Sequence, residues 1–128
     1  MTLKFKPVAR KNPGDQTAPE KYYAQVVSKG KINLRPLANR ISQISTVSTV
    51  DTLAVLEGFV QVIPEELADG NIVKLGDFGS FSVTLSSEGA DTADHLTASN
   101  IKKNSIRFRP GKLLQNVINV AGYEKEQG

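Results

Sequence analysis

Two stretches between residues 33 and 63 carry apolar side chains at helical spacing. After Asn33, a residue suited to a helix N-cap, this spacing predicts a short helix with one apolar face. Its apolar positions are Leu34, Leu37, Ala38, Ile41 and Ile44. Ser48, followed three residues later by Asp51, is typical of a capping box and predicts the start of a second helix.

The second helix is expected to run to about Ile63 and to be apolar on two sides. One stripe consists of Leu53, Leu56, Val60 and Ile63, and the other of Val55, Phe59 and Val62. Such a helix is predicted to lie either at a subunit interface or in the core of a single subunit. Pro64 is expected to end it because proline disturbs helical hydrogen bonding, with a last short turn closing at Gly70.

Strand patterns occupy the N-terminal part of the chain. Apolar and cationic residues alternate over residues 3–7, as in a strand with two unlike faces. The Asn-Pro-Gly-Asp sequence at residues 12–15 is a turn signal. Residues 21–27, rich in aromatic and β-branched side chains, predict a second strand.

A hairpin and a returning strand are predicted after the helices. Residues 71–75 form a short strand and residues 76–79 a turn. The next strand alternates between apolar residues (Phe81, Val83 and Leu85) and hydroxyl-bearing ones (Ser80, Ser82 and Thr84). Residues 86–100 lack core-forming side chains and are expected to form a loop, from which the chain returns as a strand over residues 101–109.

A third short helix is predicted after Pro110 and Gly111. Pro110 is expected at or near its first position, where the missing N–H costs nothing. The helix would bury Leu113, Leu114, Val117, Ile118 and Ala121. The polar tail from Gly122 is expected to fray.

Composition narrows the class of protein. The 128 residues, 39% apolar and 23% charged, suit one compact domain, or a domain with an appendage. The absence of cysteine excludes disulfides and thiolate metal sites. No apolar run has the length of a signal-peptide core or a membrane span, so we expect a cytoplasmic protein without membrane contact.

The cationic charge is concentrated in two segments, although the net charge is only +3. Residues 1–33 hold seven Lys or Arg against two acids. Residues 101–112 hold five cations and no acid, namely Lys102, Lys103, Arg107, Arg109 and Lys112. Arg107 and Arg109 would project from one strand face about 7 Å apart, which fits successive backbone phosphates, although such a face could also be merely solvated.

The order of the elements and two motifs resemble the HU/IHF family of bacterial nucleoid-associated DNA-binding proteins. The motifs are NIVKLGDFGSFSV at residues 71–83 and IRFRPGK at residues 106–112. The resemblance covers about residues 33–121. The N-terminal strands and the SSEG-containing loop look like a divergent HU-like branch of the kind common in Bacteroidetes.

The resemblance implies an HU/IHF-like α+β fold with two N-terminal helices, a three-stranded antiparallel β-ribbon sheet and a short C-terminal helix. Residues 1–32 would be a basic β-strand extension and residues 33–128 the DNA-binding domain. The cations implied to contact DNA are Arg107, Arg109 and Lys112, extended by Lys102 and Lys103. The residues implied to form the structural turn and core of the family motif are Phe78, Gly79, Phe81, Pro110 and Gly111.

The function implied is architectural, largely sequence-nonspecific binding of double-stranded DNA by a nucleoid-associated homodimer, through a basic β-saddle. No cofactor, metal or small-molecule substrate is implied. The resemblance fails at residues 86–100, where HU proteins have a basic arm with a wedging proline and this chain has Glu88, Asp91 and Asp94 without proline or cation. This acidic loop favours an alternative function, a protein-interaction module on an HU scaffold with weak or lost DNA binding.

Other chemical interpretations are weaker. Asp77-Phe78-Gly79 matches a kinase tripeptide, but the other kinase motifs are missing and it is interpreted as a turn. His95 is interpreted as a solvated side chain rather than a metal ligand, and no enzyme is expected. Tyr22 and Tyr23 beside Lys21 allow a third hypothesis, a stacking platform for the bases of single-stranded nucleic acid. The alternative is that one ring packs on the core face of the strand while the other lies on the surface.

Overall fold

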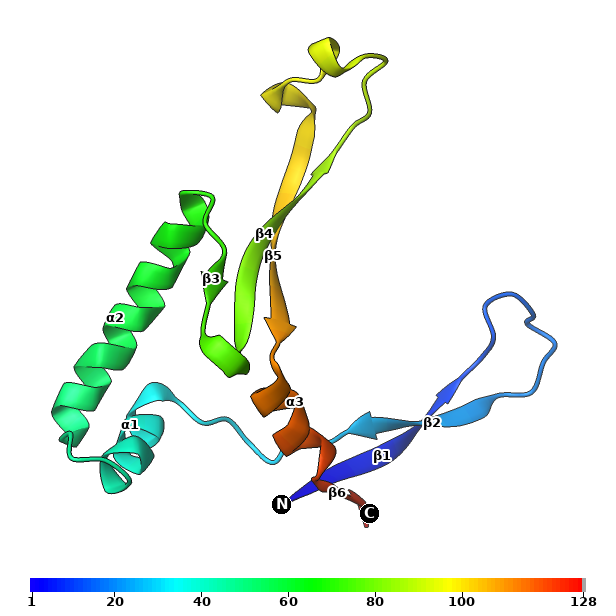
Figure 1. The fold of residues 1–128 in the computed structure, drawn as a ribbon. Coiled ribbons are helices and arrows are strands. Elements are labelled where there is room, and N and C mark those ends of the chain that lie inside the picture. Colours follow the sequence, from blue (N-terminus) through cyan, green and yellow to red (C-terminus); the bar gives the residue numbers. More distant parts are fainter. Residues whose placement is uncertain (128) are drawn as a thin grey trace. The chain divides into compact units, whose positions relative to one another are not determined.

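The computed structural model describes residues 1–127, and they form three α-helices and six β-strands (Figure 1). The strands are β1 (Thr2–Arg10), β2 (Lys21–Val26), β3 (Val73–Lys74), β4 (Gly79–Ser87), β5 (Ile101–Pro110) and β6 (Gly122–Lys125). The helices are α1 (Leu34–Gln43), α2 (Thr49–Ala68) and α3 (Lys112–Asn119), with 3-10 turns at Gly76–Phe78, Ala93–His95 and Ala98–Asn100. The predicted α+β class is confirmed.

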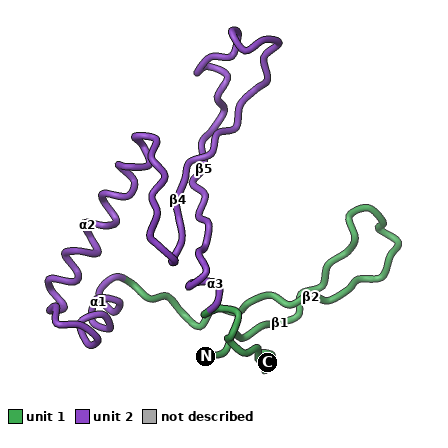
Figure 2. The backbone as a smooth tube through the Cα atoms, in the orientation of Figure 1, with its two compact units in different colours: residues 1–33, 117–128 green, residues 34–116 purple. Residues whose placement is uncertain are grey.

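The elements gather in two compact units (Figure 2). The central unit comprises residues 34–116, and the terminal unit combines residues 1–33 with the chain from Val117 onward. In the central unit, α1 packs on α2, and the strands form an antiparallel sheet in the order β3-β4-β5. The division into an extension of residues 1–32 and a domain of residues 33–128 stays a prediction.

Helix α2 is capped at both ends. The Ser48 hydroxyl accepts a hydrogen bond from the backbone N–H of Asp51 at 3.1 Å, as the sequence predicts for its start. At the other end, Gly70 has φ +91° and donates to the carbonyl of Leu67, while Asn71 donates to that of Glu66. This pair of bonds is a Schellman motif, so α2 ends where the sequence places the last turn.

The prediction that Pro64 ends the helix is wrong. Helix α2 continues for four residues beyond it, to Ala68. Proline removes one N–H donor, but the following turn carries Leu67, which is only 5% exposed. Burial of this side chain and the Schellman cap both stabilise the last turn against the lost hydrogen bond.

Two glycines allow β4, β5 and the turn before β4 to approach one another closely. Gly79 has φ +153°, and a Cβ there would lie 2.6 Å from Cζ of Phe108. Gly111 donates a backbone hydrogen bond to the carbonyl of Phe78 at 2.9 Å, and its Cβ would lie 2.6 Å from the carbonyl carbon of Asp77. Both positions therefore require glycine.

Pro110 lies outside helix α3, contrary to the prediction. It is the last residue of β5, opposite Gly79, and α3 begins two residues later at Lys112. Strand β5 is an edge of its sheet, a position where a residue without an N–H leaves no ladder bond unmade.

The terminal unit is a three-stranded sheet in the order β2-β1-β6. β1 pairs antiparallel with β2, and β6 pairs parallel with β1. The expectation that the tail from Gly122 frays is wrong, because Gly122 donates to the carbonyl of Met1 at 3.0 Å and Glu126 to that of Phe5 at 2.8 Å. The polar tail satisfies the backbone groups of β1, which pairing requires irrespective of side-chain polarity.

The described residues enclose very little apolar core. Among the described residues, those that are buried are Ala38, Thr52, Leu67 and Gly79. On α2, Val55 is 68% exposed and Phe59 is 44% exposed. Between α2 and the sheet lies an open apolar groove of about 220 Å³ lined by Phe59, Val60, Ile63, Pro64, Leu67, Phe81 and Ile106. One copy of the central unit therefore leaves the second apolar stripe of α2 uncovered.

Replacing Gly111 with alanine is expected to destabilise the protein by about 1–3 kcal/mol, the usual cost of forcing an extra carbon into a filled site. Gly89→Ala is the matched control, because nothing lies within 4 Å of its Cβ position. The control should change stability by less than about 1 kcal/mol. Thermal unfolding followed by circular dichroism compares the two, and equal melting temperatures would contradict the role given to Gly111.

Candidate nucleic-acid interface

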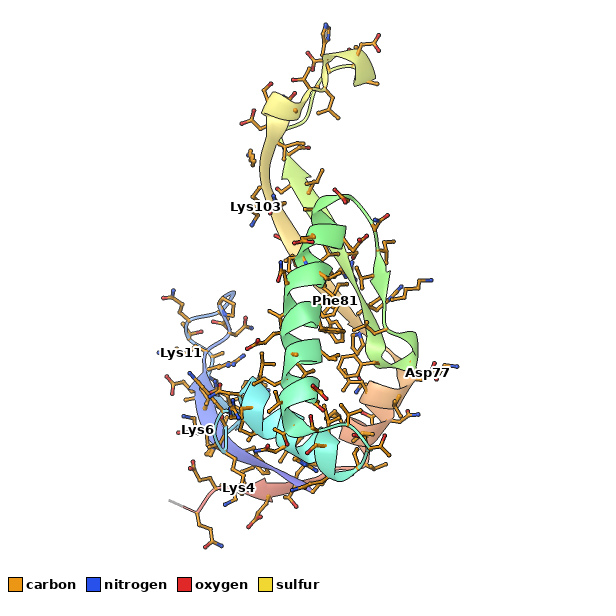
Figure 3. The ribbon with its side chains drawn as sticks, turned by 90° about the vertical axis from the view of Figure 1, so that its left-hand side faces the viewer. Lys4, Lys6, Lys11, Asp77, Phe81 and Lys103 are labelled. Atoms are coloured by element: carbon orange, nitrogen blue, oxygen red, sulfur yellow. The ribbon has the colours of Figure 1, made fainter. Side chains whose placement is uncertain are left out.

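The sheet of the central unit has one apolar face and one polar face. Phe81 stands opposite Phe108 and Val83 opposite Ile106, so these side chains share one side of the sheet. The rings of Phe81 and Phe108 lie 4.8 Å apart, and that of Phe78 lies 5.9 Å from Phe108. The aromatic cluster therefore occupies the side that faces α2, where Figure 3 labels Phe81.

The opposite face is cationic. Arg109 pairs with Ser80 and Arg107 with Ser82, while Lys103 pairs with Ser86 nearer the tip of the ribbon. Arg107 and Arg109 alternate with Ile106 and Phe108, and all three cations are exposed. Figure 3 shows the Lys103 side chain projecting from the ribbon.

Lys74 joins this face from β3, and sequence reasoning missed it. Lys74 pairs with Ser80, which pairs in turn with Arg109, so three strands contribute to one transverse row. The alternation of apolar and polar residues in NIVKL could have indicated that Lys74 is on the polar side of a strand. A strand of two residues cannot be assigned to a face of the sheet until its pairing partner is known. We call Lys74, Lys103, Arg107 and Arg109 the central basic face.

The central basic face carries positive charge without acidic residues between the cations. Strands β3, β4 and β5 contain no Asp or Glu. The positions between the cations are hydroxyl side chains, from Ser80, Ser82, Thr84, Ser86 and Ser105. Cations with interspersed hydroxyls are the side chains that most often contact phosphate oxygens.

The strand register does not place two of the predicted contact residues on this face. Ser86 pairs with Lys103 but Ser87 pairs with Ile101, so Lys102 is the extra residue of a β-bulge. The bulge interrupts the alternation of side chains, so the register assigns Lys102 to neither face of the sheet. Lys112 is exposed and is the first residue of α3, one position after Gly111. The DNA contacts of all five predicted cations stay predictions.

The end of the β4–β5 ribbon is acidic. Glu88, Asp91 and Asp94 are exposed, and the backbone N–H of Glu88 donates to the carbonyl of Asn100 at 2.8 Å, which closes the loop. Two 3-10 turns order the segment that the sequence predicts as a loop (Figure 1). We call residues 88–100 the acidic tip.

His95 and the possibilities of a metal site and a membrane-spanning helix can be assessed in the described residues. The His95 ring nitrogen Nδ1 lies 2.9 Å from the hydroxyl of Thr92. Across residues 1–127, no three His, Cys, Asp or Glu side chains are grouped to hold a metal ion. No helix in that range is long and apolar enough to cross a membrane.

Two sequence comparisons both find similarity to HU proteins. The family described as "HU domain fused to wHTH, Ig, or Glycine-rich motif" matches residues 1–125. DNA-binding protein HU-beta 2 of Neisseria meningitidis is 35% identical over 68 residues, which are 50% of this chain and 72% of the relative.

Two solved structures share the fold. A putative DNA-binding protein from Bacteroides vulgatus matches with a TM-score of 0.66 at 16% identity, over 97% of this chain and 47% of that one. The chain thus spans about half the length of that protein. The Anabaena HU–DNA cocrystal structure matches with a TM-score of 0.55 at 21% identity, over 70% of this chain and 99% of that one.

Proposed function

We propose that this chain, which belongs to the family of HU domains fused to wHTH, Ig or glycine-rich motifs, binds duplex DNA through its central basic face. The family match and the HU-beta 2 relative confirm the resemblance to HU proteins. A nucleoid location would follow from such binding.

The observation that carries the proposal is the segregation of charge on the central sheet. Arg107, Arg109, Lys103 and Lys74 share one exposed face, and no acid lies on its three strands. Neutralising phosphates with such side chains releases counterions and gives affinity that is independent of sequence. The hydroxyls between them bond to phosphate rather than discriminate among bases, so the binding is largely sequence-nonspecific.

We propose further that the binding species is a homodimer. Val55, Phe59 and Val62 are exposed on one side of α2 in a single chain. The same stripe on a second copy is complementary to it, because a two-fold interface brings equal patches together. Because these side chains are already about half covered, burying the rest would stabilise the pair by roughly 1 kcal/mol for each.

The acidic tip sets a limit on the mode of binding. A wedge between base pairs needs an apolar or prolyl tip, and carboxylates are repelled by phosphates. The proposed contacts therefore lie on the sheet and not at the tip. The tip also favours the second candidate function, a protein-interaction module with little DNA affinity. The DNA titration described next distinguishes the two functions.

Replacing both Arg107 and Arg109 with glutamine is expected to weaken duplex binding and to flatten its salt dependence. Two lost phosphate contacts reduce the slope of log K against log salt by about 1.8 per chain, and by twice that in a symmetric dimer. Anisotropy titrations of a random-sequence duplex between about 50 and 200 mM salt measure the slope.

The matched control is Arg35→Gln with Arg40→Gln, which removes the same charge from exposed positions of α1. Equal slopes for the two double variants would refute the central basic face as the DNA site. No binding by the unaltered protein at the lower salt would support the protein-interaction module instead.

Phe59→Glu is expected to dissociate the dimer, because it places a charge in the proposed apolar interface. We expect the dimer dissociation constant to rise at least about tenfold, which corresponds to about 1.4 kcal/mol. Gln61→Glu adds the same charge to α2 at an exposed polar position and should have little effect. Sedimentation at micromolar concentration measures both, and a monomeric unaltered protein would overturn the dimer.

A further inference from the structure

A second basic sheet face lies in the terminal unit. Lys4, Lys6 and Arg10 occupy alternate positions of β1, so their side chains project from the same side. Antiparallel pairing adds Lys21 opposite Arg10 and Gln25 opposite Lys6. All five side chains are exposed. We call Lys4, Lys6, Arg10 and Lys21 the terminal basic face, and Figure 3 labels two of its members, Lys4 and Lys6.

The register excludes a joint role for the two tyrosines. Tyr23 pairs with Val8 and lies on the terminal basic face, whereas Tyr22 pairs with Ala9 and lies on the other side of the sheet. They are 51% and 71% exposed, respectively. A stacking platform for unpaired bases needs rings on one surface, and here only one ring accompanies the cations. The structure therefore does not support the premise of the single-strand hypothesis.

The chemistry of the terminal basic face fits phosphate. Lys, Arg, Gln and Tyr side chains all bond to phosphate oxygens in protein–DNA complexes. Cations at alternate strand positions stand about 7 Å apart, which allows several phosphates to be contacted along one DNA strand. Two acids lie at the Lys4 end of this side of the sheet: Glu124 pairs with Lys4, and Glu126 follows two residues later, with its backbone N–H donating to the carbonyl of Phe5.

A hollow lies at the hairpin end of the terminal basic face. It measures about 560 Å³ and is lined by Arg10, Lys11, Asn12, Pro13, Ala18, Pro19, Lys21 and Tyr23. Its lining contains three cations and no acid. The nearby carboxylate of Asp15 accepts from the backbone N–H and hydroxyl of Thr17 at 3.0 and 2.6 Å, which lowers its pKa and engages it within the turn.

We infer that the terminal basic face binds the phosphodiester backbone of duplex DNA, as a contact surface additional to the central basic face. The inference rests on the proposed function in one respect only, that duplex DNA is the ligand. Charge complementarity selects this occupant, because the face presents four cations and phosphate-bonding polar groups and has a single ring for base stacking.

The test neutralises Lys6 and Arg10 together, as Lys6→Gln with Arg10→Gln. Their loss is expected to lower the slope of log K against log salt by about 1.8 per chain for a random-sequence duplex. The matched control, Lys29→Gln with Lys31→Gln, removes the same charge from the segment between β2 and α1. A second variant, Lys6→Arg with Arg10→Lys, keeps the charge and should keep the slope of the unaltered protein.

The outcomes separate this inference from the proposed function. A reduced slope for the glutamine pair, with an unchanged slope for the charge-preserving pair, supports DNA binding by the terminal basic face. This conclusion holds whatever the effect of replacing Arg107 and Arg109. A slope equal to that of the Lys29 and Lys31 control overturns it, even when the central arginines prove essential. Loss of binding by the charge-preserving pair would also overturn it, because the side chains would then act through structure rather than charge.

Discussion

The register of β4 against β5 is the constraint on which both faces of the central sheet depend. A shift of one residue would turn Arg107 and Arg109 toward the side that Phe108 occupies. Gly79 holds the register at the base of the ribbon, because any side chain there would collide with the Phe108 ring and the carbonyl of Arg109. The bulge at Lys102 lies near the tip, so the alternation that places the two arginines is not interrupted.

This alternation places the surfaces for the two proposed partners, a second copy and DNA, on opposite faces of one sheet. The apolar side of the sheet stays incompletely covered by α2, and the central basic face forms its other side. A second copy would cover the apolar surface, and DNA phosphates would neutralise the cations. The two proposed partners would therefore not compete for one surface.

The sequence predicts most features that depend on neighbours along the chain. The Ser48 cap, the Gly70 helix end and the alternation around Arg107 are all local patterns, and the structure has them. The features it misses depend on distant segments. The row containing Lys74 needs the pairing of β3 with β4, and β6 forms because β1 offers it unpaired backbone groups. A polar tail carries no hydrophobic pattern that reports such a partner.

The effect of the tip carboxylates on the attraction of the central basic face for phosphate depends on their distance from each cation. Arg109 pairs with Ser80, eight residues before Glu88, which corresponds to roughly 26 Å of extended strand. The Debye length at physiological salt is about 8 Å, so the carboxylates are screened from the arginines. Lys103 pairs with Ser86 and stands about 7 Å from the start of the tip, within that length. Attraction for phosphate would therefore fall along the ribbon from base to tip, and the proposed DNA contacts would be strongest at the arginines.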